Sequence, residues 1–244
     1  IKKIIYILKN YLNKKMNFSE YKNEQKIRVH SFVNEDLYQG YRDSLYVKIE
    51  KIFSYSESKK ILSALDFAES IEYSHNGLTK KQYLTHPLRV ANIILGHVEN
   101  VSANLLILTL LHNILEVSKI EVSKIKNLFG EKIYKSISLL TVDRSKQWDK
   151  KYKKLYYDNL NSADEIVPIV KVFDKLDNIY LLCMNPSANV RKMYVDELIF
   201  HVTFLLSKHT PQVFDIFKSA INFSIKDGYI PLDKLMSEHD IQKH

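Results

Sequence analysis

Two apolar segments between Tyr83 and Glu116 constrain the fold of this chain more than any other part of the sequence. In each segment the apolar residues recur at the spacing of one helical face, and each segment carries a histidine, His86 or His112. Pro87 suits the first turn of a helix, because proline lacks an N–H that would be left unsatisfied there. A buried imidazole needs a hydrogen-bond partner or a metal ion. Two such histidines on neighbouring helices therefore predict one shared site.

A third segment, residues 170–181, adds a carboxylate to this pair. A single histidine on an apolar helix is more often a core residue with a satisfied hydrogen bond than a ligand. Asp174, however, is flanked on both sides by apolar residues, where an isolated carboxylate is costly unless it is paired or bound to a cation. Two histidines and one carboxylate from three helices predict a site for a metal ion of borderline hardness.

The composition favours helices over sheets. The 244 residues include only 5 glycines and 5 prolines, and 45% of them are hydrophobic. No segment of any length alternates apolar and polar residues as a strand does. The sequence therefore predicts an all-α fold, a bundle of about eight to ten helices. The domain is expected to span residues 56–244, because apolar residues recur at helical spacing from Ile61 onward.

Several residues mark expected helix ends. Ser102 is placed to cap the helix that carries His112, and Gly130 should separate two short helices. The sequence Ser-Ala-Asp-Glu at 162–165 has the pattern of a capping box, and it is expected to open the helix that carries Asp174.

Charge and cysteine content limit the class of function. Cys183 is the single cysteine, which excludes an intramolecular disulfide and any zinc site built from several cysteines. The formal net charge is +8, but the lysines are scattered and no arginine-rich strip occurs. A basic balance can indicate a nucleic acid, a membrane surface or an anionic small-molecule substrate, but solvated helix faces explain most of these lysines. Nucleic-acid binding is therefore permitted but not indicated. No apolar run reaches the length of a bilayer span.

Residues 1–55 are expected to be a basic extension. Positions 1–19 contain five lysines and no acidic residue, and their apolar residues could form a helical stripe. A docking arm for a protein assembly, a membrane-surface helix, a targeting remnant or an ordinary helix packed on the domain would each fit. The sequence starts with Ile1, so we expect it to begin inside a longer product or after processing. The expected location is cytoplasmic, or organellar if a targeting segment was cleaved.

The order of the motifs resembles a known family. Thr-His-Pro at 85–87 is followed by Leu-Leu-His-Asn-Ile-Leu-Glu at 110–116, and then by Lys-Val-Phe-Asp-Lys-Leu-Asp-Asn at 171–178. Together they are similar to the HD-domain hydrolases of the RelA/SpoT family, and most of all to the small stand-alone alarmone hydrolases. The resemblance runs from about residue 61 to the 220s. It implies a Mn²⁺-dependent hydrolase that removes the 3′-pyrophosphate of guanosine tetra- or pentaphosphate.

The resemblance also names the metal ligands. Carried over by motif, they are His86, His112, Asn113 and Asp174, and Asn113 stands where the family has an aspartate. An asparagine offers a carbonyl oxygen but no charge, so a divalent ion is expected to bind more weakly. Glu116 lies four residues after His112, so both could face one ion on the same side of a helix. Such a rescue would leave the site without a general base.

A second departure concerns the acid/base pair. The resemblance implies adjacent Glu and Asp near the scissile pyrophosphate, but here Glu116 is followed by Val117, which cannot move protons. Asn113 and Glu116 are therefore the candidate catalytic residues in a weakened site. Asn178, four residues after Asp174, matches a family residue near the nucleotide.

The resemblance places further substrate contacts in two segments. The family holds the nucleotide with an Arg-Lys loop, and Lys80 and Lys81 are the nearest basic equivalents here. Lysine lacks the planar fork of arginine, so recognition of the base would be poorer. The segment 143–157, with Trp148, matches a family region that borders the substrate cleft. The interpretation that the residues themselves favour for that segment is a lysine-rich surface helix.

The sequence is compatible with three functions. The first is an alarmone hydrolase with impaired activity, and the second is a non-catalytic binding or structural subunit that keeps the hydrolase fold. The third is an HD-type phosphohydrolase for another nucleotide. Losses in the nucleotide loop, the metal shell and the acid/base pair favour weak or absent catalysis, with Mn²⁺ as the cofactor if the site functions.

Overall fold

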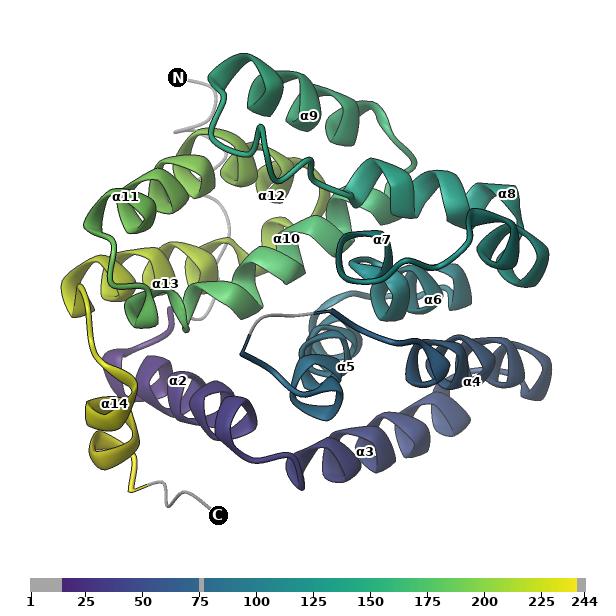
Figure 1. Cartoon of the computed structure of the whole chain (residues 1–244), viewed down its shortest axis with the longest axis horizontal. Coiled ribbons are helices and arrows are strands. Elements are labelled where there is room, and N and C mark those ends of the chain that lie inside the picture. The colour runs from purple at the N-terminus through teal and green to yellow at the C-terminus, as the bar shows by residue number, and fades with distance from the viewer. Residues whose placement is uncertain (1–14, 75–76, 241–244) are drawn as a thin grey trace.

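A computed structural model describes residues 15–74 and 77–240, and within these ranges the chain forms helices joined by turns, with no strand (Figure 1). This confirms the predicted all-α fold. Residues 1–14 of the expected extension lie outside the described ranges. The α-helices are α2 (Phe18–Val33), α3 (Leu37–Ile52), α4 (Tyr55–Ser70), α5 (Lys80–His97), α6 (Ala103–Leu111), α7 (Ile114–Val117), α8 (Val122–Leu140), α9 (Lys150–Ser162), α10 (Ile166–Ile179), α11 (Ala188–Glu197), α12 (Thr203–His209), α13 (Phe214–Asp227) and α14 (Leu232–Glu238).

Helix α10 runs through the middle of the bundle (Figure 1). It packs against α5, α6, α12 and α13, and all but two of its residues are buried. Its sequence is apolar on every side except at Lys171, Asp174, Lys175, Asp177 and Asn178. A helix that is apolar all round belongs in a core, so each of these polar residues needs a partner from a neighbouring helix.

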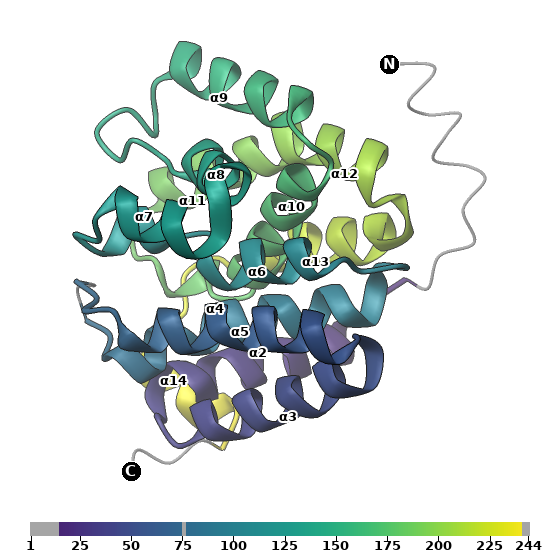
Figure 2. The same cartoon turned by 90° about the vertical axis from the view of Figure 1, so that its right-hand side faces the viewer.

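Helices α2 and α3 precede the segment expected to form the domain, and both pack on it. Figure 2 shows them along one side of the bundle, beside α4 and α5. Helix α2 contacts α5, α13 and α14, and α3 contacts α4 and α5. Tyr21 and Val29 of α2 and Leu45 and Ile49 of α3 are fully buried. Leu45 and Ile49 belong to the same hydrophobic core cluster as the buried apolar residues of α10. This part of the N-terminal region is therefore packed into the core of the bundle.

Two of the three expected helix ends are confirmed. The Ser102 side chain accepts a hydrogen bond from the Leu105 N–H at the start of α6. Gly130 interrupts α8 with φ 84 and ψ 164, a conformation that essentially only glycine adopts. The predicted capping box at the start of α10 is wrong. Glu165 is the N-cap and makes no side-chain cap bond, and the Asp164 carboxylate instead accepts from the Ile166 N–H at 3.3 Å.

Three shorter elements complete the chain: the 3₁₀ helices η1 (Leu182–Met184) and η3 (Pro211–Val213), and the π-helical turn η2 (Leu198–Val202) between α11 and α12. None of the helices in the described ranges is both long enough and apolar enough to cross a membrane.

Candidate metal centre and adjoining cleft

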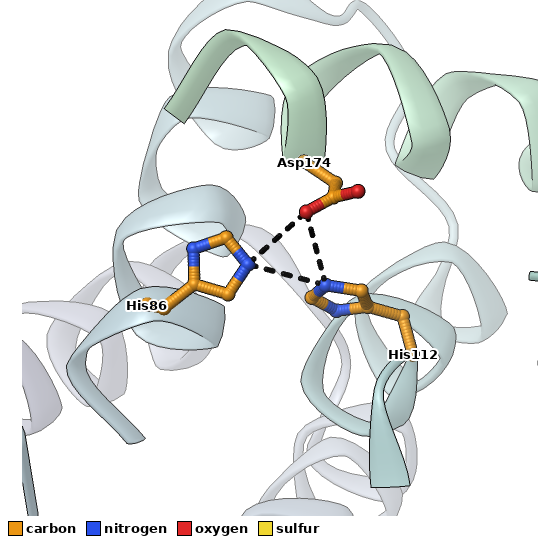
Figure 3. A group of neighbouring side chains, drawn as sticks. All are labelled: His86, His112 and Asp174. Carbon is orange, nitrogen blue, oxygen red and sulfur yellow. Dashed lines mark hydrogen bonds and ion pairs between the residues drawn. The ribbon is translucent and has the colours of Figure 1, made fainter. Parts of the chain in front are cut away.

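Three side chains from three helices meet at the centre of the bundle, as the sequence predicted (Figure 3). His86 comes from α5, His112 caps the C-terminus of α6, and Asp174 comes from α10. His86 Nε2 lies 3.3 Å from His112 Nε2 and 3.3 Å from Asp174 Oδ1, and His112 Nε2 lies 3.7 Å from the same oxygen. One ligand atom from each residue thus falls within 4.8 Å of the other two.

The outer nitrogen of each imidazole already has an acceptor. His112 Nδ1 lies 2.6 Å from the Thr109 carbonyl oxygen, and His86 Nδ1 lies 2.8 Å from Asp177 Oδ2. A carbonyl oxygen only accepts, so His112 donates from Nδ1, and an ionised Asp177 requires the same of His86. In the neutral imidazoles both Nε2 atoms then carry lone pairs. Two lone pairs and one carboxylate oxygen face one another, an arrangement that needs a cation between them.

This donor set fits a divalent metal ion. Two imidazole nitrogens and one carboxylate oxygen suit metals of borderline hardness, and the ring N–H bonded to an acceptor is the usual outer contact of a metal-binding histidine. A proton is the alternative cation. Burial lowers the pKa of His86, but Asp174 and Asp177 outweigh burial and raise that pKa above its ordinary value.

Asp174 has two further partners on its own helix. Lys171 Nζ lies 3.1 Å from Oδ2, and the Asn178 amide donates to Oδ1 at 2.7 Å. Burial raises the pKa of Asp174, but Lys171 and the two histidines lower it more, so the pKa lies well below its usual value. Asp174 is therefore ionised and available to a metal ion, although Lys171 already offsets part of its charge. Asn178, predicted to contact substrate, lies directly against this carboxylate.

Asn113 and Glu116 lie beside the three-residue group, and the Glu116 carboxylate does not join it. Asn113 forms the N-cap of α7, and its side chain hydrogen-bonds the Tyr83 hydroxyl. Burial raises the pKa of Tyr83, and this bond only partly opposes that effect. One Glu116 oxygen accepts from the Val142 N–H at 2.9 Å, and the other lies 2.5 Å from Arg144 Nη2. The Glu116 carboxylate thus faces the 142–144 loop, and its oxygens are not among the ligand atoms that converge.

A cleft of about 440 Å³ adjoins the three-residue group and shares Asp174 with it. Asn113, Glu116 and Asn178 also line the cleft, and the segment 143–157 contributes Arg144, Trp148 and several tyrosines. The segment therefore borders a cleft, as the resemblance implied, although its lysine-rich sequence favoured a surface helix. Four cationic side chains line it together: Arg144, Lys153, Lys171 and Lys175. Lys80 and Lys81, at the first turn of α5, are not among the described residues that line it.

Glu197 at the end of α11 connects the cationic residues of the cleft. It lies 2.8 Å from Lys153 Nζ and 2.8 Å from Lys175 Nζ, and it accepts a 2.6 Å hydrogen bond from the Tyr157 hydroxyl. Burial raises the pKa of Glu197, but Lys175, followed by hydrogen bonds from the lysines and Tyr157, brings it well below its ordinary value. Sequence reasoning missed Glu197, Lys153 and Lys175. The spacing of lysines and glutamates along a helix does not show whether they line a cleft or face solvent.

Known proteins share this fold and these motifs. The family described as "HD domain" matches residues 64–198, more than half of the chain. The guanosine-3′,5′-bis(diphosphate) 3′-pyrophosphohydrolase of Aquifex aeolicus (strain VF5) is 28% identical over 145 residues, which are 57% of this chain and 20% of that protein. The aligned part thus spans about a fifth of that relative's length.

Solved structures also share the architecture. One of them is described as a metazoan ortholog of SpoT that hydrolyzes ppGpp and plays a role in starvation responses. It covers 75% of this chain and 97% of its own, with a TM-score of 0.51 and 18% sequence identity, which supports a common fold.

The fold, the histidine pair on α5 and α6 and the aspartate on α10 define an HD domain, and the chain belongs to the HD-domain family. Within that family, the order of its motifs and its similarity to the Aquifex protein support a RelA/SpoT-type HD domain.

Proposed function

We propose that this chain is a (p)ppGpp 3′-pyrophosphohydrolase-like protein whose weakened metal site leaves slow hydrolysis or none. The observation that carries the proposal is the convergence of His86 Nε2, His112 Nε2 and Asp174 Oδ1 beside a cationic cleft. The Aquifex relative and the SpoT ortholog supply the substrate class, which we extend to this chain as part of the proposal.

The charges that line the cleft suit a polyanion. Its four cationic side chains are opposed by three carboxylates, those of Glu116, Asp174 and Glu197, so the lining is positive by one charge. A divalent ion at the histidines would add two more. A guanosine bis(diphosphate) is a polyanion of opposite charge, and the lysines of the lining would meet its phosphates.

The bound metal would polarise a phosphoryl oxygen and lower the pKa of a water molecule. His86, His112 and Asp174 would hold it, and Mn²⁺ is the proposed ion. Asn113, in place of a charged ligand, and Lys171, 3.1 Å from Asp174, both reduce the negative charge available to that ion. Val117 leaves Glu116 as the one acid/base candidate of the pair, and Arg144 already engages it. Weak metal binding and slow proton transfer follow from these contacts.

The test measures Mn²⁺ binding by calorimetry and pyrophosphate release from guanosine tetraphosphate in excess Mn²⁺. We expect weak Mn²⁺ binding and slow release, both lost in His112→Ala. His97→Ala is the matched control, because His97 lies on the same helix as His86 but at its exposed end. Fast release that depends on His112 would show that the site is not weakened. Release unaffected by His112→Ala would refute the proposed site.

The second candidate is a non-catalytic binding or structural subunit. Asn113 and the Lys171–Asp174 contact favour it, because both would let the site persist without a metal ion. This candidate predicts that guanosine tetraphosphate binds with equal affinity in the presence of Mn²⁺ and of chelator, with no pyrophosphate release. The docking role proposed for residues 1–55 belongs to this alternative, and it would be tested by isolating partners with and without residues 1–14.

A further inference from the structure

Asp177 is fully buried one turn from Asp174, yet its carboxylate is not part of the converging ligand group. We infer that Asp177 is a positioning residue for His86, and that helix α2 contributes to this role through Arg28. Helix α2 lies outside residues 64–198, which match the HD-domain family. The inference rests on the metal site proposed above, and it assigns a function in that site to a residue outside the matched region.

Both oxygens of Asp177 are fully engaged. Oδ2 lies 2.8 Å from His86 Nδ1 and 2.8 Å from Arg89 Nη2. Oδ1 lies 3.1 Å from Arg89 Nε and 2.9 Å from Arg28 Nε. Arg89 therefore grips the carboxylate as a planar fork, and Arg28 holds the oxygen that is turned away from His86. These contacts fix the rotation of the carboxylate, so Oδ2 stays directed at the imidazole.

Arg28 is itself held on three sides. Its Nη1 donates to the Glu24 carbonyl oxygen at 2.8 Å and to the Glu24 carboxylate at 2.6 Å. Its guanidinium lies 4.1 Å from the centre of the Tyr180 ring, and its Nε also donates to the Asp177 carbonyl oxygen at 3.1 Å. With only 2% of its surface exposed, Arg28 has little freedom to leave the carboxylate.

The positions of the protons on these side chains decide whether His86 can bind a metal ion. Guanidinium groups only donate, so both arginines require Asp177 to act as an acceptor. Asp177 then accepts the Nδ1–H of His86, and His86 Nε2 is left with a lone pair directed at His112 and Asp174. If Asp177 were absent or rotated, His86 could carry its proton on Nε2, and that nitrogen would no longer bind a metal ion. An ion pair serving stability alone would involve the arginines but would not require a 2.8 Å contact with His86.

The first test needs no metal ion, and it uses a variant only to assign a signal. Long-range ¹H–¹⁵N spectra of histidine rings distinguish the two neutral tautomers, and the His86 signal is assigned by its absence from His86→Gln. In the metal-free wild-type protein at mildly alkaline pH, we expect His86 to be protonated on Nδ1. Protonation of His86 on Nε2 would overturn the inference, whatever the activity of the protein.

The second test compares Asp177→Asn and Arg28→Ala by the same spectra and by Mn²⁺ titration. We expect Asp177→Asn to mix the tautomers and to weaken Mn²⁺ binding by about 10–100-fold. Arg28→Ala should also populate the Nε2–H tautomer, and Arg28→Lys should restore the wild-type spectrum in part. Arg42→Ala is the matched control, because Arg42 of α3 makes a similar 2.8 Å ion pair with Glu69, and it should change neither readout.

The outcomes separate this inference from the proposed function. Wild-type protein that binds no Mn²⁺ would refute the metal site, while its His86 tautomer would still decide the role of Asp177. Wild-type binding that Asp177→Asn leaves unchanged, with the same tautomer, would refute the inference and leave the proposed function standing. An Arg28→Ala spectrum identical to that of Arg42→Ala would remove helix α2 from the site.

Discussion

Arg144 Nη2 lies 2.5 Å from Glu116 Oε2, although 67% of the Arg144 side chain is exposed and only 3% of the Glu116 side chain is. A long, solvated side chain thus reaches inward to neutralise a carboxylate at the wall of the cleft. The other Glu116 oxygen accepts the Val142 N–H. Both contacts come from the 142–144 loop, so the position of this loop determines the environment of the acid/base candidate.

Removing the arginine should therefore cost stability. Arg144→Ala leaves one buried oxygen of Glu116 without its cation, and such a loss typically costs about 1–3 kcal/mol. Urea unfolding at neutral pH measures the change. Lys154→Ala is the control, because Lys154 and its partner Asp158 are both exposed, and such a pair contributes less than about 1 kcal/mol. Equal stabilities of the two variants would contradict the importance of the Glu116 contact.

Asn113→Asp should strengthen metal binding. The substitution restores a negative charge next to His112, and a direct ligand charge should exceed the roughly 10–100-fold effect of an outer contact. Calorimetry with Mn²⁺ measures the affinity, and pyrophosphate release shows whether turnover rises with it. Asn100→Asp adds the same charge at an exposed position with φ 52, which Asp tolerates, and should leave Mn²⁺ binding unchanged. An equal response of the two variants would remove Asn113 from the metal site.

The stabilising effect of Glu197 should depend on pH. Its pKa in the folded protein lies well below its ordinary value, because Lys175, Lys153 and Tyr157 outweigh the effect of burial. A lowered carboxylate pKa stabilises the fold above the unfolded-state value of about 4.3, and the stabilisation is lost as pH falls below it. Glu197→Gln should therefore be less stable than wild type at pH 7, by up to about 3 kcal/mol.

That difference in stability should shrink when urea unfolding is repeated from neutral pH down to about pH 3. Over this range Glu197 becomes protonated in the unfolded chain, which removes the advantage of the wild type. The exposed Glu50→Gln provides the comparison. A stability difference for Glu197→Gln that stays constant with pH would mean that the lysine contacts do not act through the carboxylate charge.

Two glycine substitutions should change stability in opposite directions. Gly130→Ala forces a side chain into φ 84, ψ 164, and should cost about 1–3 kcal/mol although there is open space around the position. Gly96 lies within α5 without a positive φ and also has open space, so Gly96→Ala should stabilise by about 0.4–1 kcal/mol. Thermal unfolding of both variants provides the measurement. A stabilising Gly130→Ala would contradict the described break in α8.

The sequence predicted the meeting of His86, His112 and Asp174, because each is a polar residue on an otherwise apolar helix. A polar residue in such a position must find a partner across the core, and the few available partners were one another. The all-α fold and the break at Gly130 followed from local patterns of the same kind. The metal role of these residues, and the weakening by Asn113, stay predictions.

Other parts of the site depend on tertiary packing that local patterns do not contain. The predicted capping box at 162–165 was wrong because Ser162 is the last residue of α9, whereas α10 begins only at Ile166 with Glu165 as its N-cap. The engagement of Asp177 by Arg28 joins residues 149 positions apart, and nothing in either segment alone indicates it. Whether a lysine such as Lys175 lines a cleft or faces solvent is decided by how α10 and α11 pack.

The contacts of Asp177 span most of the chain, since His86 lies 91 positions away and Arg28 lies 149 positions away. An unfolded chain cannot bring His86, His112 and Asp174 together either, so an ion that binds these three residues binds only the folded state. Thermodynamic linkage then makes the ion a stabiliser of the whole fold, by about 2.7 kcal/mol at a concentration one hundred times its dissociation constant. Because Asp177 contacts both His86 and Arg28, the concentration of the metal ion would also determine how stably helix α2 packs on the bundle.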